Sequence, residues 1–321
     1  MTPRATAPGK VMLAGEYGVL DGGLAVVAAV DRRAVARRVT GLGQRPPLSE
    51  FLVAAREVVR VVLGDDAAAT FDSIEVDTRA LSDGNRKLGL GSSAAATVAA
   101  VRLAAGNSPD ADLPLIIRLA LDAHARAQAG RGAAGSGADV VAVAHGGVIG
   151  FRSGAVRRLT VPAGLRIHFA WTGAPADTAT LVAAVNVARA AARAAAAGPA
   201  NPVDAALAAI TGAAESLADA FDASDPAACV DAFSAGARAM DALAAATGVA
   251  LVPPSVAALA ARLAPLAAAC KTTGAGGGDV LAIAAPASIT TSALDTAIVE
   301  TGLWPLHLSV DPTGVDFVTG D

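Results

Sequence analysis

Apolar residues recur along this chain with two periods, one typical of helices and the other of strands. Helical spacing and runs of strong helix formers predict helices at Leu48–Leu63, Ser92–Ala105, Leu113–Ala129, Ala138–His145, Thr178–Ala197, Pro202–Phe221, Pro226–Thr247, Ser255–Leu266 and Thr290–Thr301. Short apolar runs between turn-forming residues predict strands at Val11–Leu13, Ala25–Arg33 with its continuation Val35–Val39, Ser73–Val76, Val148–Arg152, Arg166–Trp171, Val280–Ala285 and Trp304–Val310. Because helices and strands interleave without the strict alternation of a doubly wound sheet, the pattern predicts an α+β fold.

Three glycine-rich loops interrupt this pattern at widely separated positions, Ser82–Leu90, Arg131–Gly137 and Cys270–Gly278. Ordering glycine costs conformational entropy, so such loops need a reason to persist, and close approach to a ligand is one. We therefore expect the loops to converge in space. A boundary near Ser153–Gly164 predicts an N-terminal lobe at 1–155 and a C-terminal lobe at 156–321.

The composition of the chain favours a helix-rich protein and argues against a membrane protein or a secreted, disulfide-bonded protein. Apolar residues make up 54% of the chain but aromatic residues only 3%, and alanine supplies much of the difference, so we expect many helices with small contact faces. The longest charge-free stretch, Ala242–Ala261, contains Gly248 and Pro253-Pro254, which argues against a membrane span. No secretory signal is evident, and the two cysteines, Cys229 and Cys270, lie far apart. We therefore expect a cytoplasmic protein without disulfides.

Charge and histidine content argue against two kinds of protein, those that bind nucleic acid and those that bind a metal ion through histidine. A net charge of −4 without a basic stripe or an aromatic platform makes nucleic acid a poor candidate partner. The four histidines show no metal-ligand spacing and are expected to be structural: His124, His145, His168 and His307. Cys270 adjoins the third glycine loop, where we expect sensitivity to alkylation. The sequence leaves open whether the chain is a monomer or a homodimer.

The strongest candidate for chemistry is the stretch 87–95, which reads Lys-Leu-Gly-Leu-Gly-Ser-Ser-Ala-Ala and leads into a predicted helix with Ser92-Ser93 at its N-cap. Glycine lets backbone N–H groups approach a phosphate, and the helix N-terminus adds its dipole. The serine hydroxyls can contact phosphate or hold Mg²⁺. Neither the Walker pattern nor the dinucleotide fingerprint is present. From these residues alone, an ordinary helix N-cap after a tight turn remains the alternative.

Two other stretches carry candidate chemistry. Residues 271–279 read Lys-Thr-Thr-Gly-Ala-Gly-Gly-Gly-Asp, a loop suited to close approach of substrate or phosphate, with a flexible surface linker as the alternative. Residues 7–17 read Ala-Pro-Gly-Lys-Val-Met-Leu-Ala-Gly-Glu-Tyr, in which Lys10 precedes an apolar run and Tyr17 is the only tyrosine of the chain. A lysine in this position is commonly a surface residue, so the motif is not specific by itself.

The three stretches together, in this order, resemble the motifs of the GHMP kinase superfamily, which includes galactokinases, homoserine kinases, mevalonate kinases and phosphomevalonate kinases. The resemblance extends from Ala7 to about Ile283 and implies a two-lobed α+β fold with the active site between the lobes. It also implies an ATP-dependent phosphotransferase that uses Mg²⁺. The nucleotide contacts carried over by it are Gly89, Leu90, Gly91, Ser92, Ser93 and Ala94.

Within the superfamily the details resemble the phosphomevalonate kinases. Gly9-Lys10 and Glu16-Tyr17 differ from the Gly-Arg and Gly-Glu-His of galactokinases. Asp279 stands where mevalonate kinases tend to have glycine, and Lys87 precedes the nucleotide loop as in phosphomevalonate kinases. The string Trp-Thr-Gly-Ala-Pro-Ala at 171–176 is also similar to theirs. The resemblance therefore implies phosphomevalonate as the acceptor, in the mevalonate route to isoprenoids.

This acceptor would set the roles of the charged residues. An acceptor phosphate is already anionic, so cations that offset phosphate repulsion matter more than a general base. The resemblance implies that Lys10 lies against the acceptor and that Lys87 bridges acceptor and γ-phosphate. Asp139 would orient the acceptor or hold Lys10 or Mg²⁺, whereas capping of the helix after Gly137 is its ordinary role.

Further contacts follow from the same resemblance. Ser136 would touch the acceptor phosphate, and Arg131 and Lys271 would contact the carboxylate or phosphate of the substrate, although solvated surface charges are the commoner reading for both. The expected substrate-binding residues are Tyr17, Arg131, Ser136, Lys271, Thr272, Thr273 and Gly274. The expected Mg²⁺ contacts are Ser93 and Glu16.

Three other functions compete with this interpretation. Mevalonate kinase, or another GHMP small-molecule kinase, would need Asp139 as a base for a hydroxyl acceptor. A non-catalytic nucleotide-sensing module is expected to have lost charged motif residues, yet Lys10, Lys87 and Asp139 are all present. A related decarboxylase usually has a different first motif.

Overall fold

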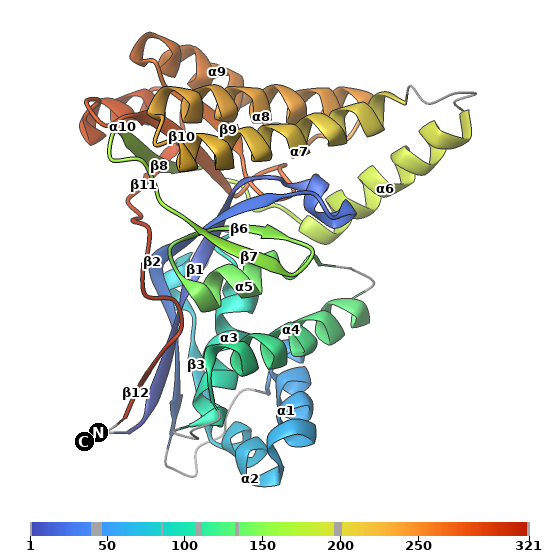
Figure 1. Ribbon diagram of the computed structural model, residues 1–321, viewed down its shortest axis with the longest axis vertical. Coiled ribbons are helices and arrows are strands. Elements are labelled where there is room, and N and C mark those ends of the chain that lie inside the picture. The colour runs from blue at the N-terminus through green and yellow to red at the C-terminus, as the bar shows by residue number, and fades with distance from the viewer. Residues whose placement is uncertain are drawn as a thin grey trace.

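Two antiparallel sheets and the helices that cover them make up this protein, of which the computed structural model describes residues 2–39, 47–84, 86–106, 111–131, 135–195 and 201–319 (Figure 1). The sheets follow one another along the length of the molecule. The two chain termini lie together at the end that is farthest from the second sheet (Figure 1).

The first sheet is built around one long hairpin. Its strands run in the order β12 (Asp316–Val318), β1 (Arg4–Ala14), β2 (Ala25–Arg38), β6 (Val148–Arg152) and β7 (Ala155–Leu159), and β3 (Ile74–Asp77) also pairs with β2. Register shifts at Pro8/Gly9 and Met12/Ala14 bend β1 along its length. The turn of the hairpin contains the short helix η1 (Tyr17–Asp21). The first predicted motif therefore spans a strand and the turn after it.

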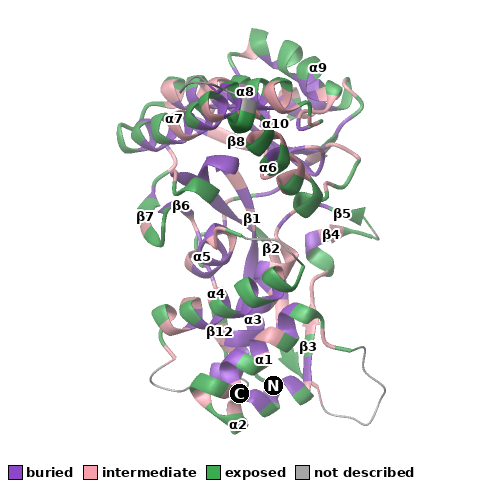
Figure 2. Ribbon diagram, turned by 90° about the vertical axis from the view of Figure 1, so that its right-hand side faces the viewer, coloured by how far each residue is buried: buried purple, intermediate pink, exposed green. Residues whose placement is uncertain are grey.

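An alanine-rich helix occupies the centre of the first layer. α3 (Ser92–Ala105) packs on β1 and β2, and almost its whole surface is buried because alanine lets its neighbours approach closely (Figure 2). Around it lie α1 (Glu50–Leu63), α2 (Asp65–Ala68), α4 (Leu113–Gly130) and α5 (Ala138–His145). Short 3₁₀ turns complete this half, η2 (Ala69–Asp72) and η3 (Arg79–Leu81).

The second sheet carries the C-terminal helices. Its strand order is β11 (Trp304–Leu306), β8 (Leu165–Trp171), β10 (Val280–Pro286) and β9 (Ala269–Thr272). Alternation divides it into two faces: Phe169 and Ala282 join the core that is shared with the first sheet, while Leu281 and Ile283 pack with the last helices. The helices of this half are α6 (Thr178–Ala195), α7 (Pro202–Asp222), α8 (Pro226–Thr247), α9 (Pro254–Leu263) with η4 (Ala264–Leu266), and α10 (Thr291–Val299).

The predicted α+β class and every predicted helix are confirmed, with ends that differ by a few residues. Five strands were missed: β7, β9, β12 and the two strands of a small hairpin, β4 (Ser82–Asp83) and β5 (Arg86–Lys87). The short helix α2 and the 3₁₀ turns η1, η2 and η3 were missed as well. The segment from Cys270 to Thr272 was expected in a loop and is strand instead, because it pairs with Ala282 and its neighbours on β10. Predictions for 132–134 and 196–197 lie outside the described residues.

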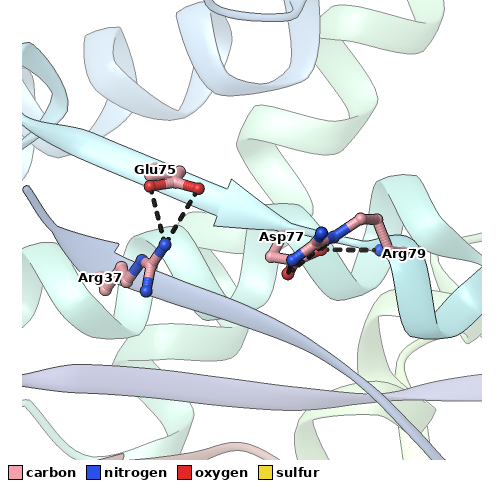
Figure 3. A network of polar contacts seen from close by, with 4 residues as sticks. All are labelled: Arg37, Glu75, Asp77 and Arg79. Atoms are coloured by element: carbon pink, nitrogen blue, oxygen red, sulfur yellow. Dashed lines mark hydrogen bonds and ion pairs between the residues drawn. The ribbon is translucent and has the colours of Figure 1, made fainter. Parts of the chain in front are cut away.

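The exposed side of the β2–β3 pair carries short-range ion pairs (Figure 3). Arg37 donates to both carboxylate oxygens of Glu75, at 3.2 and 3.1 Å. Arg79 donates to the Asp77 carboxylate and holds the pKa of that group down at about 2. Such exposed pairs contribute little to stability, so this edge of the sheet depends on its backbone ladder.

The predicted lobe boundary between residues 155 and 156 stays a prediction. β7 begins at Ala155 and belongs to the first sheet, as does β12 from the far end of the chain. Among the described helices, none is long and apolar enough to cross a membrane.

Candidate active site

The stretch 87–95 forms a tight loop that opens directly into α3. Gly89 and Gly91 both have positive φ, +78° and +73°, which side chains rarely adopt. Gly91, rather than the predicted Ser92-Ser93, is the N-cap of α3, and no side chain among the described residues caps this end. The first-turn N–H groups are therefore open to an external anion, as a phosphate-binding helix terminus requires.

Lys10 lies beside this loop. Its backbone N–H donates to the Leu90 carbonyl at 2.9 Å, which fixes β1 against the loop. Its aliphatic chain runs along Gly91, where an added Cβ would stand 2.9 Å from both Cγ and Cε of the lysine. The absence of a side chain at Gly91 thus makes room for Lys10 at the N-terminus of α3.

The third glycine loop is packed and not a flexible linker. Gly274, Gly276 and Gly277 have φ of +60°, +74° and +74°. Gly277 N–H donates to the Leu251 carbonyl at 2.7 Å, and a Cβ on Gly278 would stand 2.5 Å from the Ala174 carbonyl oxygen. The loop is therefore held against both the α8–α9 connection and the segment after β8.

Tyr17 joins the first motif to this loop. Its hydroxyl donates to the Ala275 carbonyl at 2.8 Å. Burial, with a smaller effect of the neighbouring Glu16 charge, raises the pKa of this phenol far above its usual range. The side chain is 4% exposed and lies in an apolar cluster, so it supports the third glycine loop from the protein interior.

Asp279, which ends the third loop, contacts the nucleotide loop. A Cβ added to Gly89 would lie 2.6 Å from Asp279 Oδ2, so the carboxylate rests directly on the loop backbone. The side chain's Oδ1 is buried without a hydrogen-bond partner among the described residues. Burial raises the pKa of this carboxyl group, whereas the Ala176 N–H and the charges of Lys87 and Lys10 lower it. Asp279 was not predicted as a site residue.

Two predicted site residues bind each other. Lys271 Nζ donates to Glu16 Oε1 and, at 2.7 Å, to the Thr272 carbonyl. Both charged side chains are only 1% exposed. Glu16 follows β1 and Lys271 lies on β9, so the pair joins the two sheets. The structure leaves neither group open to substrate or Mg²⁺.

The remaining predicted contacts of the third loop line its base. Thr272 ends β9 and its buried hydroxyl has no partner among the described residues. Thr273 donates its hydroxyl to the Val280 carbonyl at 2.8 Å, and Gly274 follows it at the turn. Of the two threonine hydroxyls, that of Thr272 is therefore the one that is buried without a described hydrogen bond.

Ser93 and Asp139 stand at the starts of two helices. Ser93 Oγ lies 3.3 Å from His124 Nε2, and His124 Nδ1 in turn lies 3.3 Å from Gln128 Nε2. Asp139 is the second residue of α5, whose N-cap is Gly137 without a capping side chain. The Asp139 carboxylate accepts the neighbouring Val140 N–H at 2.9 Å, which belongs to the first turn of α5, so Oδ1 has a local role at the start of this helix.

Ser136 and Arg131 have local roles in the described contacts. Ser136 Oγ accepts the Ala138 N–H at 3.3 Å. Arg131 pairs with Glu50, lies 5.0 Å from the centre of the Phe51 ring, and keeps a side chain that is 55% exposed. None of the described contacts brings Arg131 to the other two glycine loops.

Lys87 is exposed at the end of the β4–β5 hairpin. The hairpin is anchored by its neighbour Arg86, whose guanidinium lies 5.7 Å from the centre of the Trp171 ring. The positive charge of Lys87 lowers the pKa of Asp279 and, as the smallest contribution, that of Asp177. Lys87 therefore lies within electrostatic range of the third loop.

One feature of composition would have identified part of this site. Of the 25 lysines and arginines in the chain, only three are lysines, Lys10, Lys87 and Lys271. Arginine supplies the positive charge everywhere else, yet each lysine stands in one of the glycine motifs. A compact ammonium that can be desolvated differs in chemistry from a guanidinium fork, so this distribution points to a required lysine at each position.

Two recesses of the surface lie away from these motifs. One of about 550 Å³ is lined by residues that include Arg166, His168 and His307. Another of about 460 Å³ is lined by residues that include Arg152 and Glu215. Neither contains a residue of the glycine loops, so the predicted cleft between lobes stays a prediction.

Comparison with known proteins shows which proteins this chain resembles. Residues 52–147 match the family model of the GHMP kinases N-terminal domain, which covers α1, the nucleotide loop, α3 and α5. The chain is 27% identical over 337 residues to a phosphomevalonate kinase of Streptomyces sp. (strain CL190), covering 85% of this chain and 87% of that protein.

Solved structures show the same fold. The Lin0012 protein of Listeria innocua superposes with a TM-score of 0.82 at 21% identity, over 100% of both chains. The phosphomevalonate kinase of Streptococcus pneumoniae, in complex with phosphomevalonate and AMPPNP, gives a TM-score of 0.76 at 17% identity, over 96% of this chain and 99% of that chain.

The match of residues 52–147 and the shared fold together support a protein of the GHMP kinase superfamily. Within that superfamily it resembles the phosphomevalonate kinases.

Proposed function

We propose that this protein transfers the γ-phosphoryl group of ATP to phosphomevalonate, giving ADP and diphosphomevalonate. The observation that carries the proposal is the pair of lysines, Lys10 and Lys87, set beside one phosphate-type loop that begins at an uncapped helix. Joining two phosphates brings like charges together, and two ammonium groups offset that repulsion. The 27% identical relative supports the choice of acceptor.

In this proposal the nucleotide phosphates bind to the backbone of Gly89–Ala94. Positive φ at Gly89 and Gly91 turns the loop, and the open N–H groups of α3 receive the anion. Lys10 contacts the acceptor phosphate, and Lys87 bridges the acceptor and the γ-phosphate. Asp139 and Ser136, at the start of α5, orient the acceptor, while Tyr17, Thr272, Thr273 and Gly274 shape its pocket.

Mg²⁺ enters with ATP. No group of three or more histidine, cysteine, aspartate or glutamate side chains within the described residues is placed to hold a metal ion. Mg²⁺ commonly keeps waters and nucleotide phosphates as ligands and needs only one or two protein groups. The Ser93 hydroxyl, in the first turn of α3, fits such a role, whereas Glu16 is paired with Lys271. Bound Mg²⁺ would neutralise charge on the β- and γ-phosphates.

The test is ADP release by the purified protein with Mg-ATP and each of three acceptors: phosphomevalonate, mevalonate and galactose. We expect turnover with phosphomevalonate alone. Lys87→Ala should then lower kcat by about 10²–10³-fold, the loss expected on removal of one preorganised charge partner. Turnover with mevalonate instead would overturn the proposed acceptor and leave the class of enzyme intact.

Mevalonate is the second candidate acceptor, and Asp139 is the observation that favours it. Its carboxylate lies at the start of α5, where a base for a hydroxyl acceptor could stand, and the Val140 N–H is its one partner among the described hydrogen bonds. The two acceptors predict opposite effects for two substitutions, Asp139→Ala and Lys87→Ala. A hydroxyl acceptor makes Asp139→Ala the damaging change and Lys87→Ala nearly silent, whereas a phosphate acceptor reverses this order.

A further inference from the structure

Asp279 combines a left-handed backbone conformation with a buried carboxylate. It is one of four non-glycine residues with positive φ among those described, at +55°. Its backbone is fixed on both sides, since its N–H donates to the Ala174 carbonyl at 2.7 Å and its carbonyl accepts the Thr172 N–H at 2.9 Å. Glycine or asparagine would satisfy this backbone without burying a charge. The carboxylate therefore needs a separate reason.

The position of the carboxylate supplies that reason. It packs on Gly89, while the Lys10 side chain packs on Gly91, two residues further along the same loop. Lys87 precedes Gly89 by two residues. The Asp279 carboxylate and the Lys10 side chain thus lie on a single turn of backbone, and Lys87 stands at the start of that turn. Asp279 is 9% exposed, and its Oδ1 has no hydrogen-bond partner among the described residues.

A direct contact between this carboxylate and a phosphate is disfavoured, because both are anionic. Contact with the ammonium groups is favoured, and both lysines act electrostatically on the Asp279 carboxyl group. Lys87 gains most from such a partner, since its side chain is exposed on a two-residue strand and would otherwise sample many rotamers.

We propose that Asp279 is a positioning residue that orders Lys87, and with it Lys10, over the nucleotide loop before the phosphates bind. This rests on the proposed phosphoryl transfer for its purpose, but not for the ordering itself. When the phosphates arrive, the ammonium groups turn from the electrostatic field of the carboxylate to the phosphate oxygens. The lysines then do not lose their rotamer freedom during the reaction step, because that cost has been met in the free protein.

The test uses the small number of lysines. Lysine labelled with ¹³C at Cε gives three side-chain signals, which Lys10→Arg and Lys87→Arg assign. We expect Asp279→Asn to lower the ¹³Cε heteronuclear NOE of Lys87 towards the value of free lysine. The Lys271 signal serves as the internal reference, because that ammonium is buried against Glu16 and should not change.

Asp177→Asn is the matched control. Asp177 is also within range of the Lys87 charge, but it is exposed and accepts from Thr180, which asparagine can replace. We expect this variant to leave the Lys87 signal unchanged. An unchanged Lys87 signal in Asp279→Asn, or an equal change in both variants, would overturn the proposal.

Kinetics give a second readout. Asp279→Asn should lower kcat by about 10–100-fold, as misplacement of a reacting group does, with the KM for ATP within about twofold of the original. Adding Asp279→Asn to Lys87→Ala should cost less than Asp279→Asn costs in the unaltered protein, because it acts mainly through Lys87. Additive losses would contradict the proposal, as would a rise in the Mg²⁺ concentration that gives half-maximal rate, which would make Asp279 a metal ligand.

The two proposals fail separately. Lack of turnover with phosphomevalonate by the unaltered protein overturns the acceptor, while the NMR comparison of Asp279→Asn with Asp177→Asn still decides whether the carboxylate orders Lys87.

Discussion

At the scale of the single residue, reactive groups in the interior are either paired or held in their neutral form. Lys271 and Glu16 neutralise each other. The Tyr17 phenol keeps its proton because burial raises its pKa. Burial raises the pKa of the Cys270 thiol to about 12 and that of the Cys229 thiol to about 11. The expected sensitivity of Cys270 to alkylation is therefore not supported by its surroundings.

Cys270 should resist alkylation in the folded protein. At pH 8 a thiol with a pKa of about 12 is ionised in only about one molecule in ten thousand, and the side chain is 3% exposed. Iodoacetamide followed by mass spectrometry should show both cysteines unmodified in buffer and fully modified in denaturant. Rapid modification of Cys270 without loss of structure would contradict the buried position of β9.

At the scale of the element, α3 begins with glycine where a capping side chain would stabilise it. Ser, Thr, Asp and Asn caps satisfy first-turn N–H groups and are worth about 0.5–2 kcal/mol. Gly91 provides no such group, although α1, α4 and α8 all have capping side chains, Ser49, Asp112 and Asp225. The open terminus is consistent with a ligand that supplies the missing acceptor.

Gly91→Ala should weaken ATP binding far more than it weakens the fold. Alanine at φ +73° costs about 1–2 kcal/mol of backbone strain, and its Cβ would displace Lys10. Gly106, the C-cap of the same helix, has φ +58° and open space around it, so Gly106→Ala is the control for strain alone. Calorimetry with a non-hydrolysable ATP analogue should show a loss of affinity only for Gly91→Ala. Equal losses would remove the loop from the nucleotide site.

The sequence was sufficient for elements with a strong local pattern. The helices could be predicted because alanine, leucine and arginine favour helix over long stretches, and the phosphate-type loop could be predicted because its glycines directly precede one. β9 could not be predicted, because a charged residue, Lys271, stands in its middle. Burial of this lysine depends on its ion pair with Glu16, which is distant in the sequence. Asp279 was missed for a related reason, since its contact with Gly89 joins positions 190 residues apart in the sequence.

At the scale of the whole molecule, the Glu16–Lys271 pair is a polar connection between the two sheets. Glu16 follows β1 of the first sheet, and Lys271 lies on β9 of the second. The lysine stem also packs on Gly236 of α8, where an added Cβ would stand 3.0 Å from its Cε. One side chain thus links the hairpin turn, the second sheet and a covering helix.

Removing one partner of this pair should be costly. Glu16→Gln leaves a buried ammonium unpaired, which typically costs about 3–5 kcal/mol of unfolding free energy. The double variant Glu16→Leu, Lys271→Met should recover most of this loss, since a buried ion pair can often be replaced by apolar groups. Urea unfolding measures both. Glu75→Gln, which breaks the exposed Arg37 pair of Figure 3, should cost less than about 1 kcal/mol.

The confinement of lysine to three positions has a practical consequence for handling the protein. Amine-directed coupling, whether to a sensor surface, an ester dye or a cross-linker, has only Lys10 and Lys87 as accessible lysines beside the α-amino group, because Lys271 is 1% exposed. Coupling through either lysine will block a group that is proposed to bind phosphate. Thiol coupling will fail on the two buried cysteines. A cysteine introduced at Val187 on α6, which is 71% exposed, offers an attachment point that leaves both the amines and the core untouched.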